Sequence, residues 1–178
     1  ESPEKHKVVE LINDTINKII NNEIDLSELV ITKTYKPVKK NENLPQIALV
    51  KKITARDPGN APRYNDKIHY IITDPETIKD VPQYLKVESP EYIREHNLKI
   101  DANYYINYLS KPICELLNFF IENPENLFKI PLKNYKANRK IELLKINPPP
   151  VKEKKKRITL KKEPKGSIQT TINFEPLD

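Results

Sequence analysis

The sequence predicts an α+β fold that is mainly α-helical, with a few short strands. Apolar residues recur at three- and four-residue spacing in several long stretches, which is the period of a helix. Only two runs, 29–33 and 67–73, are short, rich in β-branched residues and bounded by turn-forming residues, as strands are. We expect residues 1–144 to form one domain. Residues 145–178 are rich in lysine and proline, and we expect them to form a disordered basic tail.

In the first half of the chain, each expected element has a local signal. Residues 3–23 predict a helix, because apolar residues recur at helical spacing and a Ser-Pro pair opens the run. The strand at 29–33 comes next, after a single helical turn. Residues 44–56 predict a second long helix, which must stop before Pro58 because proline lacks an N–H donor. The strand at 67–73 follows the loop after this helix.

The second half of the chain is expected to be irregular at first and then helical. Residues 74–88 are punctuated by prolines and predict no regular element, whereas Ser-Pro-Glu opens a short helix over 89–97. The longest helical run is 102–120, and Pro112 inside it should kink the helix or split it. A further helix or loose hairpin is expected over 123–144. The stripe of the longest run that should face the core consists of Tyr105, Leu109, Ile113, Leu116 and Phe120.

The composition excludes several classes of protein. No run approaches the roughly 20 apolar residues of a membrane span, so no membrane contact is expected. The first residues are polar and lack the apolar core of a signal peptide, and the absence of Met predicts that the chain is part of a longer polypeptide. A single cysteine, Cys114, excludes an intramolecular disulfide and favours a reducing compartment. Its apolar neighbours favour a buried structural thiol over a nucleophile.

No catalytic or metal-binding constellation is expected within this chain. Nucleotidyl transfer needs carboxylates clustered around two metal ions, and the sequence contains no Asp-x-Asp. Its histidines, His6, His69 and His96, lack the spacing of metal ligands. With glycine only at Gly59 and Gly166, no Gly-rich phosphate loop is possible. We therefore expect no metal and no cofactor in this chain, and a function that depends on binding.

Positive charge is concentrated in one segment of the chain. Between Lys33 and Lys67 there are nine Lys or Arg and three acidic residues, a net charge of +6. Residues 1–32 carry a net charge of −4 and residues 68–144 a net charge of −1. Such a local excess is typical of a phosphate-binding face. The alternative is a solvated helix face and turn, which is what most charge runs are.

The loop within this basic segment favours the phosphate-binding interpretation. Gly59 lies between Pro58 and Pro62, and it allows either a positive φ or a close approach of the backbone to a ligand. Asp57 and Asp66 are expected to act as hydrogen-bond acceptors inside the loop. The basic residues around it are Lys51, Lys52, Arg56, Arg63 and Lys67. Thr32 and Lys33, at a strand end, are equally consistent with phosphate contact and with an ordinary surface.

Three segments, in this order, resemble the thumb domain of family B DNA polymerases of the delta-like type. They are LVITK at 29–33, the run from LPQIALVKKITAR to YIIT at 44–73, and the run from PEYIREHNLKIDANYY to LLNFF at 90–120. In that family a basic helix precedes an R-x-P-G-x-x-P-x-x-G-D-R loop, a strand and an I-D-x-x-Y-Y helix. Asn65 replaces the second glycine of that loop, and Lys67 replaces an arginine. The combination of motifs is specific, although each one alone is weak.

The resemblance implies a thumb that holds primer–template duplex behind a polymerase active site. It implies that Mg²⁺ and its carboxylate ligands belong to a palm domain outside this chain, and that the palm and other domains of the polymerase are partners. A lysine-rich tail stands where cellular delta-type enzymes carry cysteine-rich metal modules, which favours a large DNA virus and a location in the host nucleus or at a cytoplasmic replication site. The residues expected to contact duplex phosphates are Thr32, Lys33, Lys51, Lys52, Arg56, Gly59, Arg63 and Lys67.

The end of the tail, GSIQTTINFEPLD, is a second candidate site. Gln169, Ile172 and Phe174 resemble the sliding-clamp-binding motif, although Phe174 comes one position early and the second aromatic residue is missing. This predicts a processivity factor as a partner. A nuclear localisation signal or a non-specific DNA tether, centred on VKEKKKR, is an equal alternative, and an inert tail is the third. For the whole chain, the alternative from another class is a stand-alone basic interaction module that recruits a replication partner through this tail.

Overall fold

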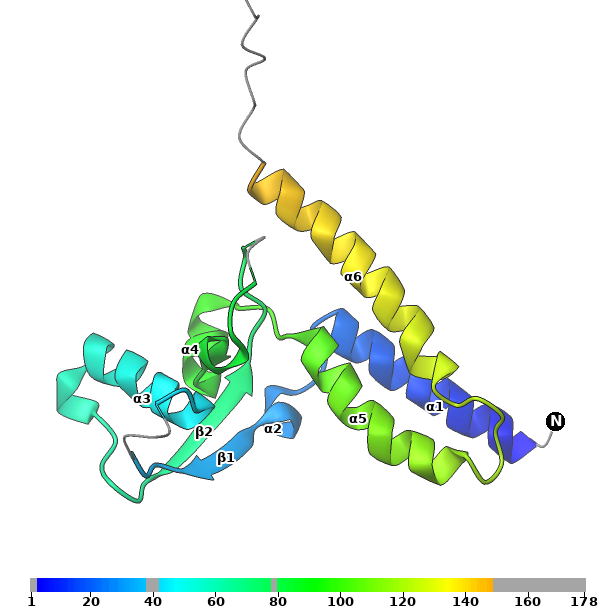
Figure 1. Cartoon of the computed structure of the whole chain (residues 1–178), viewed down its shortest axis with the longest axis horizontal. Coiled ribbons are helices and arrows are strands. Elements are labelled where there is room, and N and C mark those ends of the chain that lie inside the picture. The colour runs from blue at the N-terminus through cyan, green and yellow to red at the C-terminus, as the bar shows by residue number, and fades with distance from the viewer. Residues whose placement is uncertain (1–2, 38–41, 78–79, 149–178) are drawn as a thin grey trace, which may run out of the picture.

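The computed structural model describes residues 3–37, 42–77 and 80–148, and it has the predicted α+β, mainly helical fold (Figure 1). Its elements in chain order are α1 (Pro3–Ile20), α2 (Leu26–Leu29), β1 (Ile31–Thr34), α3 (Pro45–Arg56), the 3₁₀ turn η1 (Pro58–Asn60), β2 (Lys67–Ile72), the 3₁₀ turn η2 (Gln83–Leu85), β3 (Val87–Glu88), α4 (Pro90–His96), α5 (Ala102–Leu117) and α6 (Asn126–Ile146).

A small antiparallel sheet with strand order β1-β2-β3 lies on one side of the molecule, next to α3 and α4 (Figure 1). Helices α1, α5 and α6 pack together on the other side. Buried residues from both sides form one hydrophobic cluster, which includes Ile19 of α1, Leu49 of α3 and Ile71 of β2. Helices α3 and α4 thus pack on the sheet. The end of the β1–β2 pair at Thr34 and Lys67 lies away from the three-helix side.

Strand β3 lies within residues 74–88, where the sequence predicted no regular element. It pairs Val87 with Ile72 and Glu88 with Ile71. At its entrance, the backbone N–H and the hydroxyl of Thr73 both donate to the carbonyl of Lys86, at 2.6 and 2.8 Å. A strand of two residues is too short to show an alternating pattern, so only its partner strand reveals it.

The side chain of Tyr105 joins the sheet to the helical side. It is 5% exposed, and its hydroxyl accepts from the N–H of Ile72 at 2.9 Å and donates to the carbonyl of Leu29 at 3.1 Å. Burial raises the pKa of Tyr105, so the hydroxyl remains a neutral donor and acceptor. One side chain therefore satisfies backbone groups of two segments far apart in the sequence.

Replacing this tyrosine tests how much the junction contributes to stability. We expect Tyr105→Phe to lower the free energy of unfolding by about 1–3 kcal/mol, because it leaves the buried N–H of Ile72 without an acceptor. Urea denaturation followed by circular dichroism measures the change. Tyr108→Phe is the matched control, because Tyr108 is 68% exposed and should change stability by less than about 0.5 kcal/mol. Equal effects of the two substitutions would contradict this role.

The two long C-terminal helices differ from expectation in detail. Helix α5 continues through Pro112, which lies on its exposed side, where water can replace the lost N–H donor. The core-facing stripe ends in Leu117, at 4% exposed, whereas Leu116 and Phe120 are 66% and 50% exposed. The hairpin alternative is wrong, since residues 126–146 form one helix that also includes the first two residues assigned to the tail.

Candidate nucleic-acid interface

The loop from Asp57 to Asp66 is closed by its own two carboxylates, as predicted. Asp57 accepts from the N–H of Gly59 at 3.1 Å and from the side chain of Asn60 at 2.6 Å. Asp66 accepts from the N–H of Arg63 at 2.6 Å. The expected positive φ occurs at Asn65, where φ is 71°, and no glycine among the described residues has one. A Cβ at position 59 would lie 3.4 Å from Oδ1 of Asp57, an ordinary contact, so close approach of the backbone to a ligand stays a prediction.

The loop is fastened to the end of β1. Tyr35 donates its N–H to the carbonyl of Asp66 at 2.8 Å, and its own carbonyl accepts from the N–H of Asn65 at 2.9 Å. The side chains of Arg63 and Tyr64 are exposed, the latter at 65%. The loop thus presents a cation and an aromatic ring beside the sheet while its backbone stays fixed.

One face of the β1–β2 pair continues this polar surface. Thr32 lies opposite His69 and Thr34 opposite Lys67, so all four side chains point to the same side. The Thr32 hydroxyl lies 2.9 Å from Nδ1 of His69, and Nζ of Lys67 donates to the Thr34 hydroxyl at 2.9 Å. Lys33 is also exposed but belongs to the other face, opposite Ile68.

Two of the predicted phosphate-binding residues, Lys52 and Arg56, have an acidic partner within the chain. Both lie on α3, four residues apart, and both reach the buried carboxylate of Glu88. Arg56 forms two hydrogen bonds to it, at 2.8 and 2.9 Å, and Lys52 forms one at 2.8 Å. Lys52 also donates to the carbonyl of Val87, and the guanidinium carbon of Arg56 lies 3.7 Å from the ring centroid of Tyr92. These contacts tie α3 to β3 and α4.

The charge state of Glu88 follows from this cluster. Burial alone would raise the pKa of Glu88, but the hydrogen bonds from Arg56 and Lys52 outweigh that effect and hold the pKa below its ordinary value. The same pair raises the pKa of Arg56. The cluster is therefore ionised at neutral pH and carries one net positive charge in place of two.

The other predicted residues are less engaged. Lys51 lies 3.9 Å from Glu42, and both side chains are more than 60% exposed, so this pair contributes little. Within the described residues, the side chains of Lys33 and Arg63 have no hydrogen-bond or ion-pair partner, and Lys67 meets only a hydroxyl. The structure thus separates Lys52 and Arg56, which are held by Glu88, from the more available cations Lys33, Lys51, Arg63 and Lys67.

His69 and Tyr64 of this surface, and Glu88 at the centre of its cluster, were not among the predicted site residues. The alternation in KIHYII could have placed His69 beside Lys67, because residues two apart share a strand face. For Tyr64, only its place in the loop could have suggested a role in this surface. Glu88 carried none at all, since it lies 36 residues from Lys52 and 32 from Arg56.

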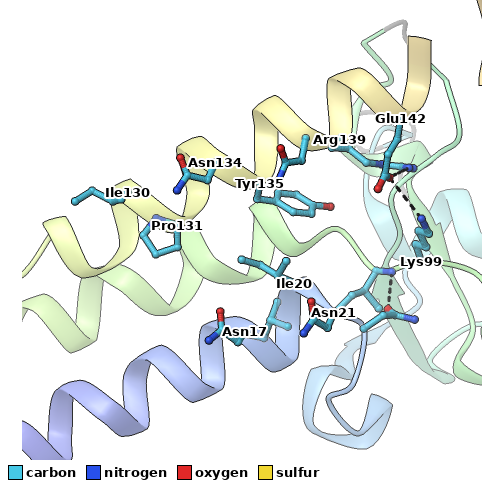
Figure 2. A pocket seen from close by; sticks show the side chains of 14 residues that line it. Asn17, Ile20, Asn21, Lys99, Ile130, Pro131, Asn134, Tyr135, Arg139 and Glu142 are labelled. Carbon is cyan, nitrogen blue, oxygen red and sulfur yellow. Dashed lines mark hydrogen bonds and ion pairs between the residues drawn. The ribbon is translucent and has the colours of Figure 1, made fainter. Parts of the chain in front are cut away.

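A separate hollow of about 530 Å³ lies between α1 and α6 (Figure 2). Asn17 and Ile20 of α1, with Asn21 just after it, line one side, and Tyr135 and Arg139 of α6 line the other. None of the predicted phosphate-binding residues lines it, and it lies on the helical side of the molecule, away from β1.

Arg139, at the end of this hollow, anchors α6 to the body of the molecule. Its Nε donates to Asp74 at 2.6 Å and its Nη1 to Glu142 at 3.1 Å, and Glu142 also lies 3.6 Å from Lys99. Asp74 further accepts from the hydroxyl of Tyr135 at 3.3 Å. These bonds fix the rotation of α6 about its own axis.

Other kinds of site find little support in the described part of the chain. It contains no group of three or more His, Cys, Asp or Glu placed to hold a metal ion. No helix in it is long and apolar enough to cross a membrane. Cys114 is half-buried, and burial raises the pKa of its thiol, whereas a nucleophilic cysteine needs a lowered one. The candidate partner-binding residues of the tail, Gln169, Ile172 and Phe174, lie outside the described residues.

Comparison with known proteins gives one consistent result. Residues 2–120 match the model of a family described as DNA polymerase family B. The chain is 32% identical over 123 residues to the DNA polymerase delta catalytic subunit of Plasmodium falciparum (69% of this chain, 11% of the relative). It is 34% identical over 121 residues to that of Drosophila melanogaster (67% and 11%) and 36% identical over 112 residues to a DNA polymerase of Pyramimonas orientalis virus (61% and 9%).

The chain therefore spans about a tenth of the length of these curated relatives. The family match includes every element from α1 to α5, and so the whole of the polar surface described above. Helix α6 lies beyond the matched residues. The match covers well over half of the sequence, and the chain belongs to DNA polymerase family B.

Proposed function

We propose that this chain is the thumb of a DNA-directed DNA polymerase and holds primer–template duplex through sequence-independent phosphate contacts. The family match supports this, as do relatives named as polymerases and polymerase catalytic subunits. Nucleotidyl transfer and its Mg²⁺ would then belong to a palm domain outside this chain, and the chain alone would be inactive. The names of the relatives do not favour a stand-alone interaction module.

The observation that carries the proposal is the distribution of charge around the 57–66 loop. Both of its acids accept hydrogen bonds from N–H groups of the loop itself. Arg63 has no hydrogen-bond or ion-pair partner among the described residues, and Lys67, just after the loop, meets only the Thr34 hydroxyl. The two carboxylates keep their charge, but they are hydrogen-bonded to the loop's own N–H groups. The cations are therefore the groups of this surface that a phosphate can contact. Exposed cations and hydroxyls suit a ligand that is gripped by its backbone and not read by its bases.

We assign different roles to the predicted residues. Arg63 and Lys67 supply positive charges to phosphates on the loop and strand surface, and the Thr32 hydroxyl is an additional donor. Lys33, on the other face of the β1–β2 pair, and Lys51, on α3, would contact phosphates from outside that surface. Gly59 lets a phosphate approach the backbone closely. In this assignment, Lys52 and Arg56 are positioning residues, because their contacts with Glu88 hold α3 and the loop that follows it in place.

Two further assignments concern the tail and the source of the protein. We assign Gln169, Ile172 and Phe174 to contact with a sliding clamp or other processivity factor, with the basic run before them as a tether. We also favour a viral polymerase, which would act in the host nucleus or at a cytoplasmic replication site. The lysine-rich tail is the feature that supports a virus, and one of the relatives is a virus polymerase.

Salt dependence of DNA binding tests the proposal on the 178-residue chain. If this surface neutralises four or five phosphates, the logarithm of the association constant should fall against the logarithm of salt concentration with a slope of about −4 or steeper, at about −0.9 per contact. Fluorescence anisotropy with duplexes of unrelated sequence measures it. Affinities should agree within about threefold between sequences. A slope near zero, or a strong preference for one sequence, would contradict the proposal.

A further inference from the structure

Helix α6 carries a stripe of lysines that the proposed interface does not use. We call Lys129, Lys133, Lys136 and Lys140 the α6 stripe; all four are exposed. Their spacing of four, three and four residues places them within about 60° of the helix circumference, over a length of about 16 Å. The stripe is therefore a continuous basic ridge.

The stripe has few acidic neighbours. Lys129 pairs with Glu125 at 2.7 Å, but within the described residues Lys133, Lys136 and Lys140 have no acidic partner. The one acid in α6, Glu142, contacts Arg139 and Lys99 instead. Neither Glu125 nor Glu142 thus contacts the last three lysines of the stripe.

This arrangement is unfavourable for an isolated helix. Like charges three or four residues apart destabilise a helix by about 0.2–0.5 kcal/mol per pair, and the stripe contains three such pairs. Helices that only need solubility mix both signs on their exposed face. In this same chain, α1 pairs Lys18 with Asp14 at 2.8 Å. Lys129 has the same compensation from Glu125, but Lys133, Lys136 and Lys140 lack it among the described residues, which indicates a polyanionic ligand.

Packing turns the stripe toward solvent. Phe128, Leu132 and Arg139 are buried on the side of α6 that faces the body of the molecule, and the stripe lies about a quarter of a turn from them. The charge of Arg139 is taken up by Asp74 and Glu142. Figure 1 shows α6 reaching beyond the ends of α1 and α5, so its C-terminal half is not covered by them.

We infer that the α6 stripe is a second binding site for the phosphodiester backbone of nucleic acid, separate from the loop and strand surface. Lysine supplies a compact charge on a flexible stem, which suits contact with phosphates in any sequence. A duplex carries one negative charge per ~1.7 Å of axis, so a ridge of about 16 Å lies along some ten charges. The inference rests on the proposed function only for the identity of the polyanion, since its residues are different.

The test is the salt slope of the triple variant Lys133→Gln, Lys136→Gln, Lys140→Gln in the 178-residue chain. Removing three contacts should make the slope on duplex DNA shallower by about 2.7, or by about 2.1 on a single strand of equal length. The triple Lys→Arg variant should keep the wild-type slope. A loss on either probe supports a phosphodiester site and identifies the strand form it prefers. Unchanged slopes on both probes would overturn the inference.

Two parallel variants separate this inference from the proposed function. Arg94→Gln with Lys111→Gln removes two exposed cations of α4 and α5, and it should leave the slope unchanged. If it lowers the slope as much per charge as the triple variant does, only net charge matters and the stripe is not a site. Arg63→Gln with Lys67→Gln tests the loop. A shallower slope in the loop variant alone overturns only the stripe. A shallower slope in the triple variant alone overturns only the loop assignment.

Discussion

Replacing Glu88 with alanine is expected to lower the free energy of unfolding by about 3 kcal/mol, which for a chain of this size lowers the melting temperature by about 6–12 °C. The side chain of Glu88 is 8% exposed and receives three hydrogen bonds from Lys52 and Arg56. Removing it leaves two cations facing each other. The cost should lie at the lower end of the range for buried pairs, because Lys52 and Arg56 are themselves 29% and 38% exposed and can recover some water.

The pH dependence of stability identifies the charge of Glu88 as the cause. A carboxylate whose pKa is lowered by folding contributes fully above its unfolded-state pKa of about 4.3, and the contribution is lost as pH falls through the lower folded-state value. The difference in stability between wild type and Glu88→Gln should therefore be constant near neutral pH and shrink below about pH 4. Thermal unfolding at a series of pH values measures it. A difference that is independent of pH would show that packing, and not charge, is responsible.

Arg139→Ala should have a comparable or larger effect, about 3–5 kcal/mol, because it leaves the carboxylate of Asp74 in a poorly solvated place without its cation. Arg139 and Asp74 are 9% and 16% exposed, and Nε donates to the carboxylate at 2.6 Å. Since Arg139 also fixes the rotation of α6, this helix should lose its docking first. Hydrogen exchange should then show faster exchange in α6 than in the sheet.

Glu142→Gln is the matched control for this experiment. It removes the other acid that Arg139 contacts, but Glu142 is 52% exposed, so the loss should be below about 1 kcal/mol. The buried Nη2 of Arg139 has no partner among the described residues, and all of the arginine's strong bonding therefore depends on two acids. If Glu142→Gln destabilised the protein as much as Arg139→Ala, the Asp74 contact could not be the main anchor.

Local signals in the sequence were sufficient for most of the helices. Ser89 was predicted to start a helix, and its side chain accepts from the N–H of Tyr92. Asp101 caps the next helix in the same way, by accepting from the N–H of Tyr104. The long helix α3 begins at Pro45 and ends before Pro58, as predicted. Capping and termination depend on residues within one turn of each other, so a single sequence contains all the information that they need.

Contacts between distant segments were not predictable in the same way. The sequence showed Lys52 and Arg56 on one face of a helix, but it could not show that Glu88 lies beneath them. Both cations were therefore predicted to contact phosphate. The end of the α5 stripe was misplaced for a related reason: Leu116 and Leu117 are neighbours, and the packing of α5 against α1 and α6 decides which of them is buried. Which cations remain available is a property of the tertiary structure.

The salt slope of Arg63→Gln with Lys67→Gln shows whether the loop and strand surface holds duplex through its available cations. The 178-residue chain carries further positive charge in its tail, so the difference between variants, and not the absolute slope, is decisive. The slope should become shallower by about 1.8, at about 0.9 per lost contact. Arg94→Gln with Lys111→Gln, which also removes one arginine and one lysine, should match wild type. An unchanged slope in Arg63→Gln with Lys67→Gln, or an equal change in the two double variants, would contradict a phosphate-binding role for the loop and strand surface.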